Sequence, residues 1–225
     1  MHDPIYSITP FTLLDYPGKT ACILWFAGCN MRCTYCYNPD IVLGKGRISI
    51  AQALEFLWSR RGLLQGVVLS GGECTLHPAI LPLAETAKQY GFEVKIDTNG
   101  SQPKVLETLI TRNLVDYIAL DFKALEYRYQ AITQSALFPE FVESLLLLNR
   151  SKIPFEVRTT VHSELINLQD LQEMVRFLQE KAYHGTYYIQ HYVNSVPVLG
   201  TLGWSLKKGN LSALSVYGIQ VVERG

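Results

Sequence analysis

The sequence predicts an α/β protein, a partial (β/α)6 TIM-like barrel with parallel strands inside and helices outside. Six short runs of β-branched and aromatic residues are each bounded by turn residues, as in strands. Segments with helical spacing of apolar residues lie between them, one in each interval. Strands that alternate with helices imply parallel strands joined by right-handed crossovers, and six are too few for a full eight-stranded barrel.

The predicted elements follow one another along the chain. The strands are expected at residues 20–26, 66–70, 92–97, 115–121, 154–161 and 186–191. The helices are expected at residues 50–58, 80–90, 105–114, 138–148 and 168–182. Ser49 and Gln52 have the spacing of a capping box at the start of the first helix. The run 216–222 would add a strand, although Gly218 weakens that prediction.

Length and composition favour one domain. The chain has 225 residues, 48% of them hydrophobic, which is enough for one well-filled core. We expect a single domain over residues 1–225, with a core at about 18–192 and a C-terminal extension at 193–225. Acidic and basic residues number 20 each, so bulk charge indicates neither a nucleic acid nor a membrane surface as partner.

The chain carries no segment typical of export or membrane insertion. Residues 1–10 lack a basic start and an apolar run, and no apolar stretch reaches the roughly 18–20 residues that a membrane span needs. Three of the five cysteines lie within eight positions, at 29–36, which favours metal binding over a disulfide framework. We therefore expect a soluble protein in a reducing compartment, the cytoplasm.

Polar clusters follow the predicted strands. In parallel α/β architectures chemistry collects at the carboxyl ends of the strands, so these clusters are expected to share one rim. They are 28–36, Gly71-Gly72-Glu73, Asp97-Thr98-Asn99-Gly100, Asp121-Phe122-Lys123, 158–162 and His191.

The first cluster contains Cys29, Cys33 and Cys36 in a Cys-x-x-x-Cys-x-x-Cys arrangement. Three thiolates on so short a loop can ligate three of the four irons of a 4Fe-4S cluster. The fourth iron would stay open, able to chelate a small molecule through an amine and a carboxylate and to pass it an electron.

Two other chemistries remain open for these cysteines. A structural zinc site wants four ligands, and Cys22, Cys74 or a remote histidine could complete one. Alternatively, Cys33 and Cys36 could form a redox thiol pair, although Cys29 would then be superfluous. Cys22, in the middle of a strand, is expected to be buried and inert, and Cys74 has no assigned role.

With Tyr35 directly before the last cysteine, the motif resembles that of the radical S-adenosylmethionine superfamily. Within it, the chain is similar to activating enzymes of glycyl radical proteins, especially the anaerobic ribonucleoside-triphosphate reductase activating proteins. The resemblance covers about residues 8–191. It rests on Asp15-Tyr16-Pro17-Gly18-Lys19, Cys36-Tyr37-Asn38-Pro39-Asp40, Ser70-Gly71-Gly72-Glu73 and Asp97-Thr98-Asn99-Gly100.

The resemblance implies roles for two motifs. Gly71, Gly72 and Glu73 would meet the methionyl amine of S-adenosylmethionine, although the same segment could be an ordinary strand-to-helix turn. Asp97, Thr98 and Asp121 would hold a monovalent cation beside the cofactor carboxylate, since hard oxygen ligands suit such an ion. A plain Asn-Gly turn is the alternative at residues 97–100.

Further cofactor contacts are expected on the later strands. Lys123 and the backbone around Phe122 would contact the nucleoside or the carboxylate, unless Lys123 only pairs with Asp121 on the rim. Arg158, if it points inward, needs a ligand carboxylate or an acidic partner. His191 matches a histidine near the ribose, and Tyr35, Tyr37 and Phe122 would shelter the adenine unless they simply fill a core.

The resemblance implies one 4Fe-4S cluster that cleaves S-adenosylmethionine after reduction by a flavodoxin or ferredoxin. The resulting 5′-deoxyadenosyl radical would take a hydrogen from a glycine Cα of a partner enzyme. The partner that the resemblance favours is anaerobic ribonucleotide reductase. A barrel of about six strands leaves an open side for such a glycine loop. Two rivals stay open: a radical enzyme that modifies another peptide or small molecule, and a non-catalytic zinc or redox-thiol protein.

Overall fold

The structure, a computed structural model, describes residues 3–206 and 209–224 and divides into two compact units. Unit 1 comprises Met1–Asn30, Asn38–Thr98 and Lys104–Ala119, and unit 2 comprises Met31–Tyr37, Asn99–Pro103 and Leu120–Gly225. The strands follow the chain order, β1-β2-β3-β4 in unit 1 and β6-β7-β8 in unit 2. Strand β5 carries the chain from the first unit into the second.

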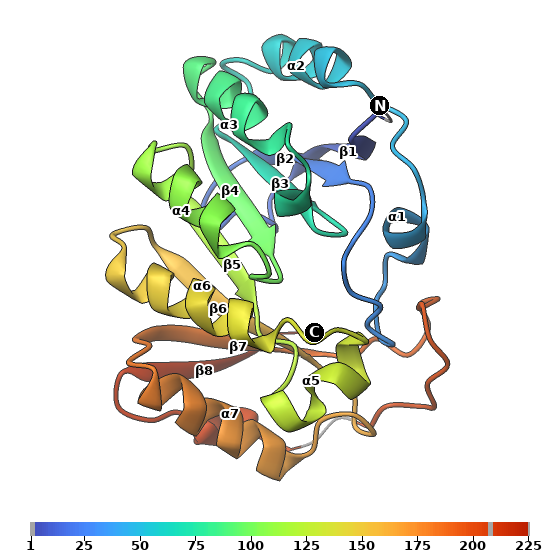
Figure 1. Cartoon of the computed structure of the whole chain (residues 1–225), viewed down its shortest axis with the longest axis vertical. Coiled ribbons are helices and arrows are strands. Elements are labelled where there is room, and N and C mark those ends of the chain that lie inside the picture. Colours follow the sequence, from blue (N-terminus) through green and yellow to red (C-terminus); the bar gives the residue numbers. More distant parts are fainter. Residues whose placement is uncertain (1–2, 207–208, 225) are drawn as a thin grey trace. The chain divides into compact units, whose positions relative to one another are not determined.

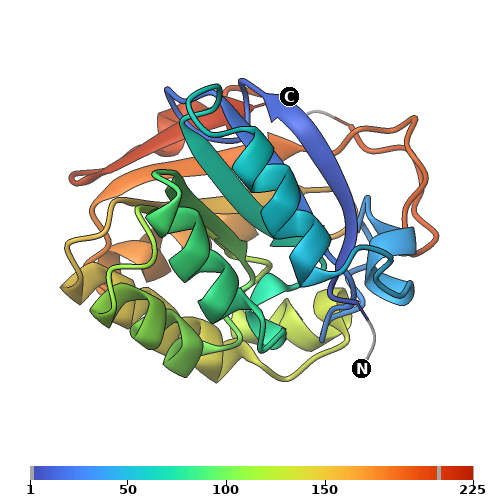
Figure 2. The same ribbon diagram turned by 90° about the horizontal axis from the view of Figure 1, so that it is seen from above.

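Unit 1 is a sheet with helices along one side (Figures 1 and 2). Strand β2 pairs in parallel with β3, and β3 pairs in parallel with β4. Leu24, Val68 and Ile96, one from each strand, are fully buried and form part of its core. The elements are β1 (Ile5–Thr12), β2 (Ala21–Phe26), α1 (Pro39–Leu43), α2 (Ile50–Ser59), β3 (Gly66–Gly71), η1 (Cys74–Leu76), α3 (Ile80–Gln89), β4 (Glu93–Thr98), α4 (Pro103–Thr111) and β5 (Tyr117–Asp121).

The predicted capping box is confirmed at the start of α2. The Ser49 hydroxyl accepts a hydrogen bond from the Gln52 backbone N–H at 3.2 Å, and the Ser49 N–H donates to Gln52 Oε1 at 2.9 Å. The two side chains thus satisfy backbone donors that the first turn leaves without intrahelical partners.

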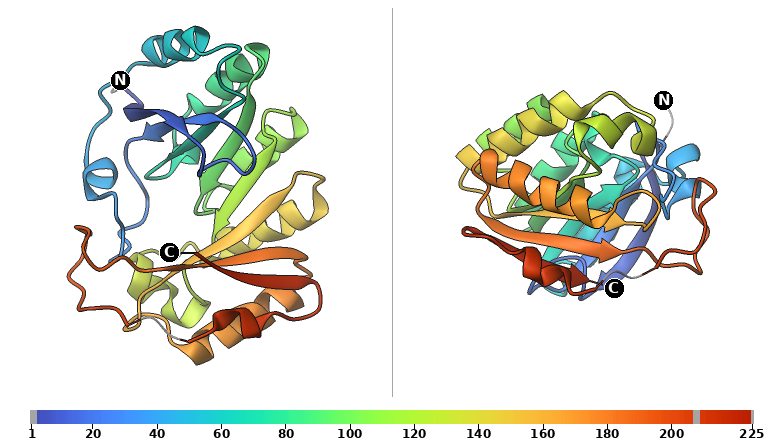
Figure 3. Two further views of the ribbon diagram at one scale, coloured as in Figure 1. Left: turned by 180° about the vertical axis from the view of Figure 1, so that it is seen from behind. Right: turned by 90° about the horizontal axis from the view of Figure 1, so that it is seen from below.

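Strand β1 is absent from the sequence prediction. It runs antiparallel beside β2 at the edge of the sheet, as Figure 3 shows, with a register irregularity between Thr9 and Thr12. Pro10 lies within that irregularity and cannot donate a ladder hydrogen bond, which only an edge strand or a bulge tolerates. The position of Pro10 is therefore consistent with an edge strand.

Unit 2 repeats the pattern with α6 and α7 on one face of its strands (Figure 3). Strand β6 pairs in parallel with β7, and β7 pairs in parallel with β8. Tyr187 and Ile189 on β7 and Leu171 and Leu178 on α7 are fully buried. The elements after β5 are α5 (Glu126–Thr133), α6 (Phe138–Arg150), β6 (Phe155–Val161), α7 (Leu168–Glu180), β7 (Gly185–His191), η2 (Leu211–Leu214) and β8 (Ile219–Arg224).

The last strand corrects the prediction for residues 216–222. Strand β8 spans Ile219–Arg224, and Gly218, with φ of 83°, lies in the turn before it. Residue 216 forms an isolated bridge with Ile219 instead of starting the strand. The C-terminal extension therefore contributes a strand to the sheet of unit 2.

The α/β class, the six predicted strands and the five predicted helices are confirmed, each within two or three residues at its ends. Besides β1, the prediction lacks the short helix α1 and helix α5. Helix α5 buries Tyr129, Ile132 and Thr133, which have helical spacing but span little more than one turn and include only one aliphatic side chain, so the segment gives a weak helical signal. In the described part of the chain no single helix is long and apolar enough to cross a membrane, although the bent pair α5 and α6 together reaches that length and composition.

Candidate active site

The cysteine loop joins β2 to α1 without helix or strand. Cys29, Cys33 and Cys36 form no disulfide; Cys33 is 7% exposed, and the other two are partly exposed. In unit 2, the Arg32 N–H donates to the Thr133 carbonyl at 2.8 Å, and the Thr34 N–H donates to the Ile132 carbonyl at 3.3 Å. The second half of the loop is thus fastened to the end of α5, the helix that the sequence did not predict.

The Gly71-Gly72-Glu73 turn lies directly against the start of this loop in unit 1. The Gly72 N–H donates to the Phe26 carbonyl and the Glu73 N–H donates to the Gly28 carbonyl, both at 2.9 Å. A Cβ on Gly72 would lie 2.0 Å from the Gly28 oxygen and 3.1 Å from Cys29 Cβ. The glycines are therefore needed for close backbone approach, and they bring two motifs that are distant in sequence into contact.

Glu73 is 2% exposed and begins the short helix η1. Its Oε1 accepts from the Thr75 backbone N–H at 3.1 Å, from the Thr75 hydroxyl, and from the Thr98 hydroxyl at 2.9 Å. The carboxylate thus caps the turn, as the structural reading of this motif expects, and it links the glycine motif to Thr98 on β4.

Asp97 also lies in unit 1 and forms a buried ion pair that the sequence did not indicate. Lys95, two residues earlier on the same face of β4, is 2% exposed, and its ammonium pairs with Asp97 Oδ1. Asp97 Oδ2 accepts from the Ser70 hydroxyl at 3.2 Å. The alternation of residues 93, 95 and 97 along the strand was the signal that could have revealed Lys95.

Cys74 and Cys22 are structural. Both are fully buried, and the Cys74 thiol donates to the Leu69 and Asp97 carbonyls at 3.4 Å. Burial raises the pKa of Cys22 to about 12 and raises that of Cys74 well above its ordinary value. Burial thus favours the protonated form of both thiols, and both lie outside the cysteine loop.

Asp121 is the centre of a charged group in unit 2. Its Oδ2 accepts from Lys123 Nζ at 3.0 Å and its Oδ1 accepts from Arg158 Nε at 2.9 Å. Burial acts to raise the pKa of Asp121, but Arg158 and Lys123 outweigh it, so the pKa is lowered. Arg158 does have the acidic partner that its inward position requires, and the group carries one positive charge more than negative.

Tyr35 and Cys33 lie near the same group. The Lys123 ammonium is 5.9 Å from the centroid of the Tyr35 ring, which is 3% exposed. Burial raises the pKa of Cys33, while the charge of Lys123 acts in the opposite direction. Unit 2 therefore brings Cys33, Tyr35, Asp121, Lys123 and Arg158 together.

Phe122 fills the core of unit 2. Its ring is fully buried and stacks on Phe141 with centroids 4.8 Å apart. Its backbone carbonyl accepts from the Thr159 hydroxyl at 2.7 Å, and its N–H donates to the Arg158 carbonyl at 2.7 Å. The Phe122 ring thus packs in the core, which was the alternative to the expectation that it shelters the adenine.

The C-terminal extension contacts the cysteine loop in unit 2, a feature with no sequence motif. The Leu199 N–H donates to the Cys36 carbonyl at 3.0 Å, and the Gly200 N–H donates to the Thr34 carbonyl at 2.9 Å. Tyr37 accepts from the Val193 N–H at 2.8 Å and stacks on Tyr192. These bonds are mostly from backbone atoms, so side-chain patterns could not reveal them.

His191 is oriented by the last strand. Its Nε2 lies 2.7 Å from Glu223 Oε2, and Glu223 Oε1 accepts from the Leu211 N–H at 2.8 Å. The hydrogen bond with His191 lowers the pKa of Glu223. Residues 193–225 thus supply a partner for a predicted cofactor residue.

The donor set of the loop suits an iron–sulfur cluster. Three free thiols within eight residues are the ligand type and number that a 4Fe-4S cluster with one open iron uses. In residues 3–206 and 209–224 no three His, Cys, Asp or Glu side chains are already arranged as a metal site. The fit of the cluster therefore rests on the chemistry of the three thiols.

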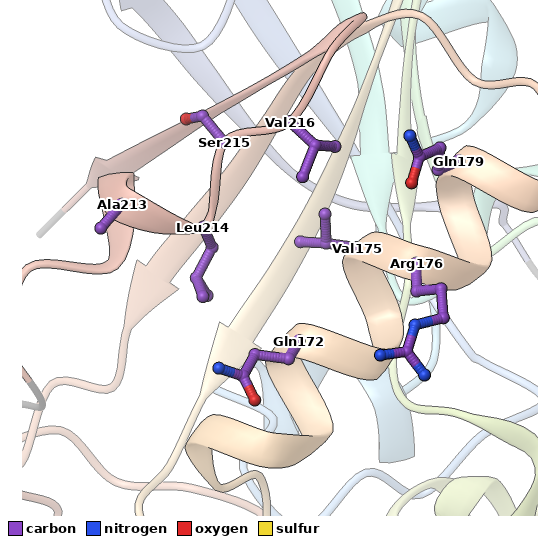
Figure 4. Close-up of a pocket in the computed structure, with 8 residues that line it drawn as sticks. All are labelled: Gln172, Val175, Arg176, Gln179, Ala213, Leu214, Ser215 and Val216. Carbon is purple, nitrogen blue, oxygen red and sulfur yellow. The ribbon is translucent and has the colours of Figure 1, made fainter.

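A pocket elsewhere in unit 2 contains none of the predicted site residues. Figure 4 shows it between α7 and the segment at η2, with a volume of about 420 Å³. It is lined by Gln172, Val175, Arg176, Gln179, Ala213, Leu214, Ser215 and Val216. This set holds no thiol, carboxylate or imidazole, so it carries none of the predicted chemistry.

Known proteins resemble the chain both in sequence and in structure. Residues 23–178 match the model of the Radical SAM superfamily. A Methanocaldococcus jannaschii protein named as a glycyl-radical enzyme activating enzyme is 31% identical over 78% of this chain and 75% of its own length. The pyruvate formate-lyase-activating enzyme of Clostridium pasteurianum is 33% identical over 53% of this chain and 52% of its own length.

Solved structures share the fold at low identity. Streptococcus suis SuiB bound to S-adenosylmethionine matches with a TM-score of 0.67 and 15% identity, covering 90% of this chain and 52% of that one. QueE from Escherichia coli matches with a TM-score of 0.56 and 15% identity, covering 85% and 84%. With the family model matching more than half of its residues, this chain belongs to the Radical SAM superfamily.

Proposed function

We propose that this chain is an activating enzyme of a glycyl radical enzyme, that it cleaves S-adenosylmethionine reductively, and that its partner is an anaerobic ribonucleotide reductase. One observation supports the S-adenosylmethionine chemistry: the cysteine loop begins directly against the glycine turn, where Gly72 packs against Gly28 and Cys29. The names of the relatives support the glycyl radical partner. The segments Asp15-Tyr16-Pro17-Gly18-Lys19 and Cys36-Tyr37-Asn38-Pro39-Asp40 support the choice of the reductase.

Cys29, Cys33 and Cys36 are the residues that would hold the cluster. A reduced 4Fe-4S cluster supplies the electron that breaks the carbon–sulfur bond of the sulfonium. Electrons come from an external donor, a flavodoxin or ferredoxin. Cleavage of this bond would yield methionine and a 5′-deoxyadenosyl radical. That radical would take a hydrogen atom from a partner glycine Cα, giving 5′-deoxyadenosine and a glycyl radical.

The other residues bind and orient. The backbone at Gly71 and Gly72 can approach the methionyl amine, because neither residue has a side chain in the way. Lys123 and Arg158 carry the surplus positive charge beside Asp121 and suit the cofactor carboxylate. His191, held by Glu223, is assigned to the ribose, and Tyr35 and Tyr37 to the edge of the nucleoside site.

The test is a radical assay with the purified partner. Anaerobic protein, S-adenosylmethionine and reductant are mixed with an anaerobic ribonucleotide reductase, and the electron paramagnetic resonance spectrum is recorded. We expect the doublet of a glycyl radical together with 5′-deoxyadenosine, and loss of the doublet when the partner glycine is changed to alanine. The same mixture with a pyruvate formate-lyase should give no radical; a radical there alone would reassign the partner.

The two rival functions give different results. A radical enzyme of another substrate class would form 5′-deoxyadenosine and a modified peptide or small molecule. It would give no glycyl radical on the ribonucleotide reductase or on the pyruvate formate-lyase. A zinc or redox-thiol protein would be colourless and iron-free after anaerobic purification. Either result would replace the proposed activation reaction.

A further inference from the structure

The two carboxylates predicted to bind a monovalent cation are both already neutralised by side chains. In unit 1, Lys95 extends from the same face of β4 as Asp97, and its ammonium pairs with Asp97 Oδ1. Asp97 Oδ2 accepts from the Ser70 hydroxyl. In unit 2, Asp121 accepts from Lys123 on one oxygen and from Arg158 on the other.

The third predicted ligand is also engaged. The Thr98 hydroxyl donates its hydrogen to Glu73 Oε1 at 2.9 Å, and Thr98 is 2% exposed. Its orientation is therefore set by a buried carboxylate. All three side chains named for the cation are thus committed within their own unit.

The charges argue the same way. Lys95 neutralises Asp97, and the group of Asp121, Lys123 and Arg158 has a net charge of plus one. Within each unit, an alkali cation added at the carboxylate would face a positive side chain that already contacts it: Lys95 at Asp97, and Lys123 and Arg158 at Asp121. Like charges at such short range repel. Lys95 is fixed by burial at 2% exposure and cannot swing out to solvent.

We propose that the Lys95 ammonium takes the place of the monovalent cation, so that this chain binds and cleaves S-adenosylmethionine without one. The Lys95 ammonium is part of the protein and is present at every salt composition. The affinity for the cofactor should therefore not depend on sodium or potassium. Lys95 acts through Asp97 and is a positioning residue. The inference rests on the proposed cleavage reaction, and the formation of 5′-deoxyadenosine in any buffer tests that reaction separately.

The experiment uses the reconstituted holoenzyme in potassium chloride, sodium chloride or choline chloride at equal ionic strength. We expect the Kd for S-adenosylmethionine and the rate of 5′-deoxyadenosine formation to agree within twofold in the three salts. Thermal unfolding midpoints should also agree. A tenfold or greater gain in binding with potassium or sodium would overturn the proposal, whereas absence of cleavage in all three salts would instead overturn the proposed function.

Variants sharpen the result. Lys95→Met removes the charge and nearly keeps the length of the side chain. The variant should therefore bind the cofactor at least tenfold more weakly in choline chloride, and potassium or sodium chloride should restore the binding. Lys95→Arg should remain insensitive to the salt, and it covers the case in which Lys95→Met fails to fold. Lys19→Met is the matched control, because it removes the ammonium from the partly exposed pair between Lys19 and Glu93 on β4. Its binding of the cofactor should also be insensitive to the salt. A Lys95→Met protein that folds and shows no recovery would contradict the substitution of lysine for cation.

Discussion

The two units hold their predicted site residues in different ways. In unit 1, Glu73, Thr98 and Lys95 are each 2% exposed; Thr98 donates to Glu73, and Lys95 pairs with Asp97 on the same strand. In unit 2, Asp121, Lys123 and Arg158 keep 15–23% of their side-chain surface, and the loop around them is fastened by α5 and by the C-terminal extension. The predicted site residues of unit 1 therefore form a buried network. Those of unit 2 form a partly exposed charged group, beside a loop that is hydrogen-bonded to α5 and to the C-terminal extension.

The difference matters for the chemistry proposed. A buried network fixes backbone groups where a ligand amine can meet them, whereas a partly exposed group with a surplus positive charge can exchange water for a ligand carboxylate. Each of the following substitutions perturbs one side of this comparison.

The largest effect is expected for the buried pair of unit 1. Lys95→Met removes a fully buried ammonium group and leaves Asp97, whose side chain is 14% exposed, without that partner, so it should lower the free energy of unfolding by about 3–5 kcal/mol. Arg158→Met should cost less, about 1–3 kcal/mol, because Lys123 still pairs with Asp121. Denaturant titration of both variants checks the order. An Arg158→Met protein less stable than Lys95→Met would invert the comparison.

Gly71 tests close packing in unit 1. Gly71→Ala combines φ of 127° with a Cβ 2.3 Å from the Phe26 oxygen, so we expect a loss of about 2–5 kcal/mol. Gly91 has φ of 87° and open space around it, so Gly91→Ala should cost only the backbone strain, about 1–2 kcal/mol. Equal losses in the two variants would show that the contact with β2 contributes nothing.

Gly200 tests how the extension holds the loop in unit 2. A Cβ there would lie 2.8–2.9 Å from three atoms of Thr34, one of them backbone, so Gly200→Ala should separate the extension from the cysteine loop. The expected cost is about 1–3 kcal/mol, with faster hydrogen exchange at the amides of Leu199 and Gly200. Gly209→Ala, with nothing within 4 Å, is the control and should leave exchange at those amides unchanged.

The smallest effect is expected at Glu223. Its pKa is lowered in the folded protein, so its contribution is present above the unfolded value near 4.3 and is lost as pH falls through the folded value. The pair is partly exposed, so Glu223→Gln should cost less than about 1 kcal/mol at pH 7. The difference between variant and parent should shrink as pH falls below the unfolded pKa and vanish once pH is below the lowered folded pKa; a difference that persisted there would point to packing instead of charge.

The sequence predicted best what local chemistry determines. The cysteine spacing, the Gly71-Gly72 turn and the Ser49 capping box each depend on residues close together in the chain, and β2, β3 and β4 follow their β-branched runs. Strand β1 was missed because Pro10 interrupts an edge strand, and α5 because its buried set spans little more than one turn and includes only one aliphatic side chain. The Lys95–Asp97 pair could have been anticipated from the alternation along β4, but that alternation does not show that Lys95 is buried. The contacts of Leu199 and Gly200 are backbone bonds between distant parts of the chain, which no motif encodes.

The central claim is that Cys29, Cys33 and Cys36 hold a cluster that cleaves S-adenosylmethionine. The most direct test is to reconstitute the protein without oxygen, measure iron and sulfide, and measure 5′-deoxyadenosine after reduction, with each of the three cysteines changed to alanine. Cys22→Ala and Cys74→Ala, at the two buried thiols, serve as matched controls. We predict about four irons per chain and cleavage in the parent and both controls, and loss of cleavage in all three loop variants. Zinc in place of iron, or cleavage retained by any loop variant, would contradict the claim.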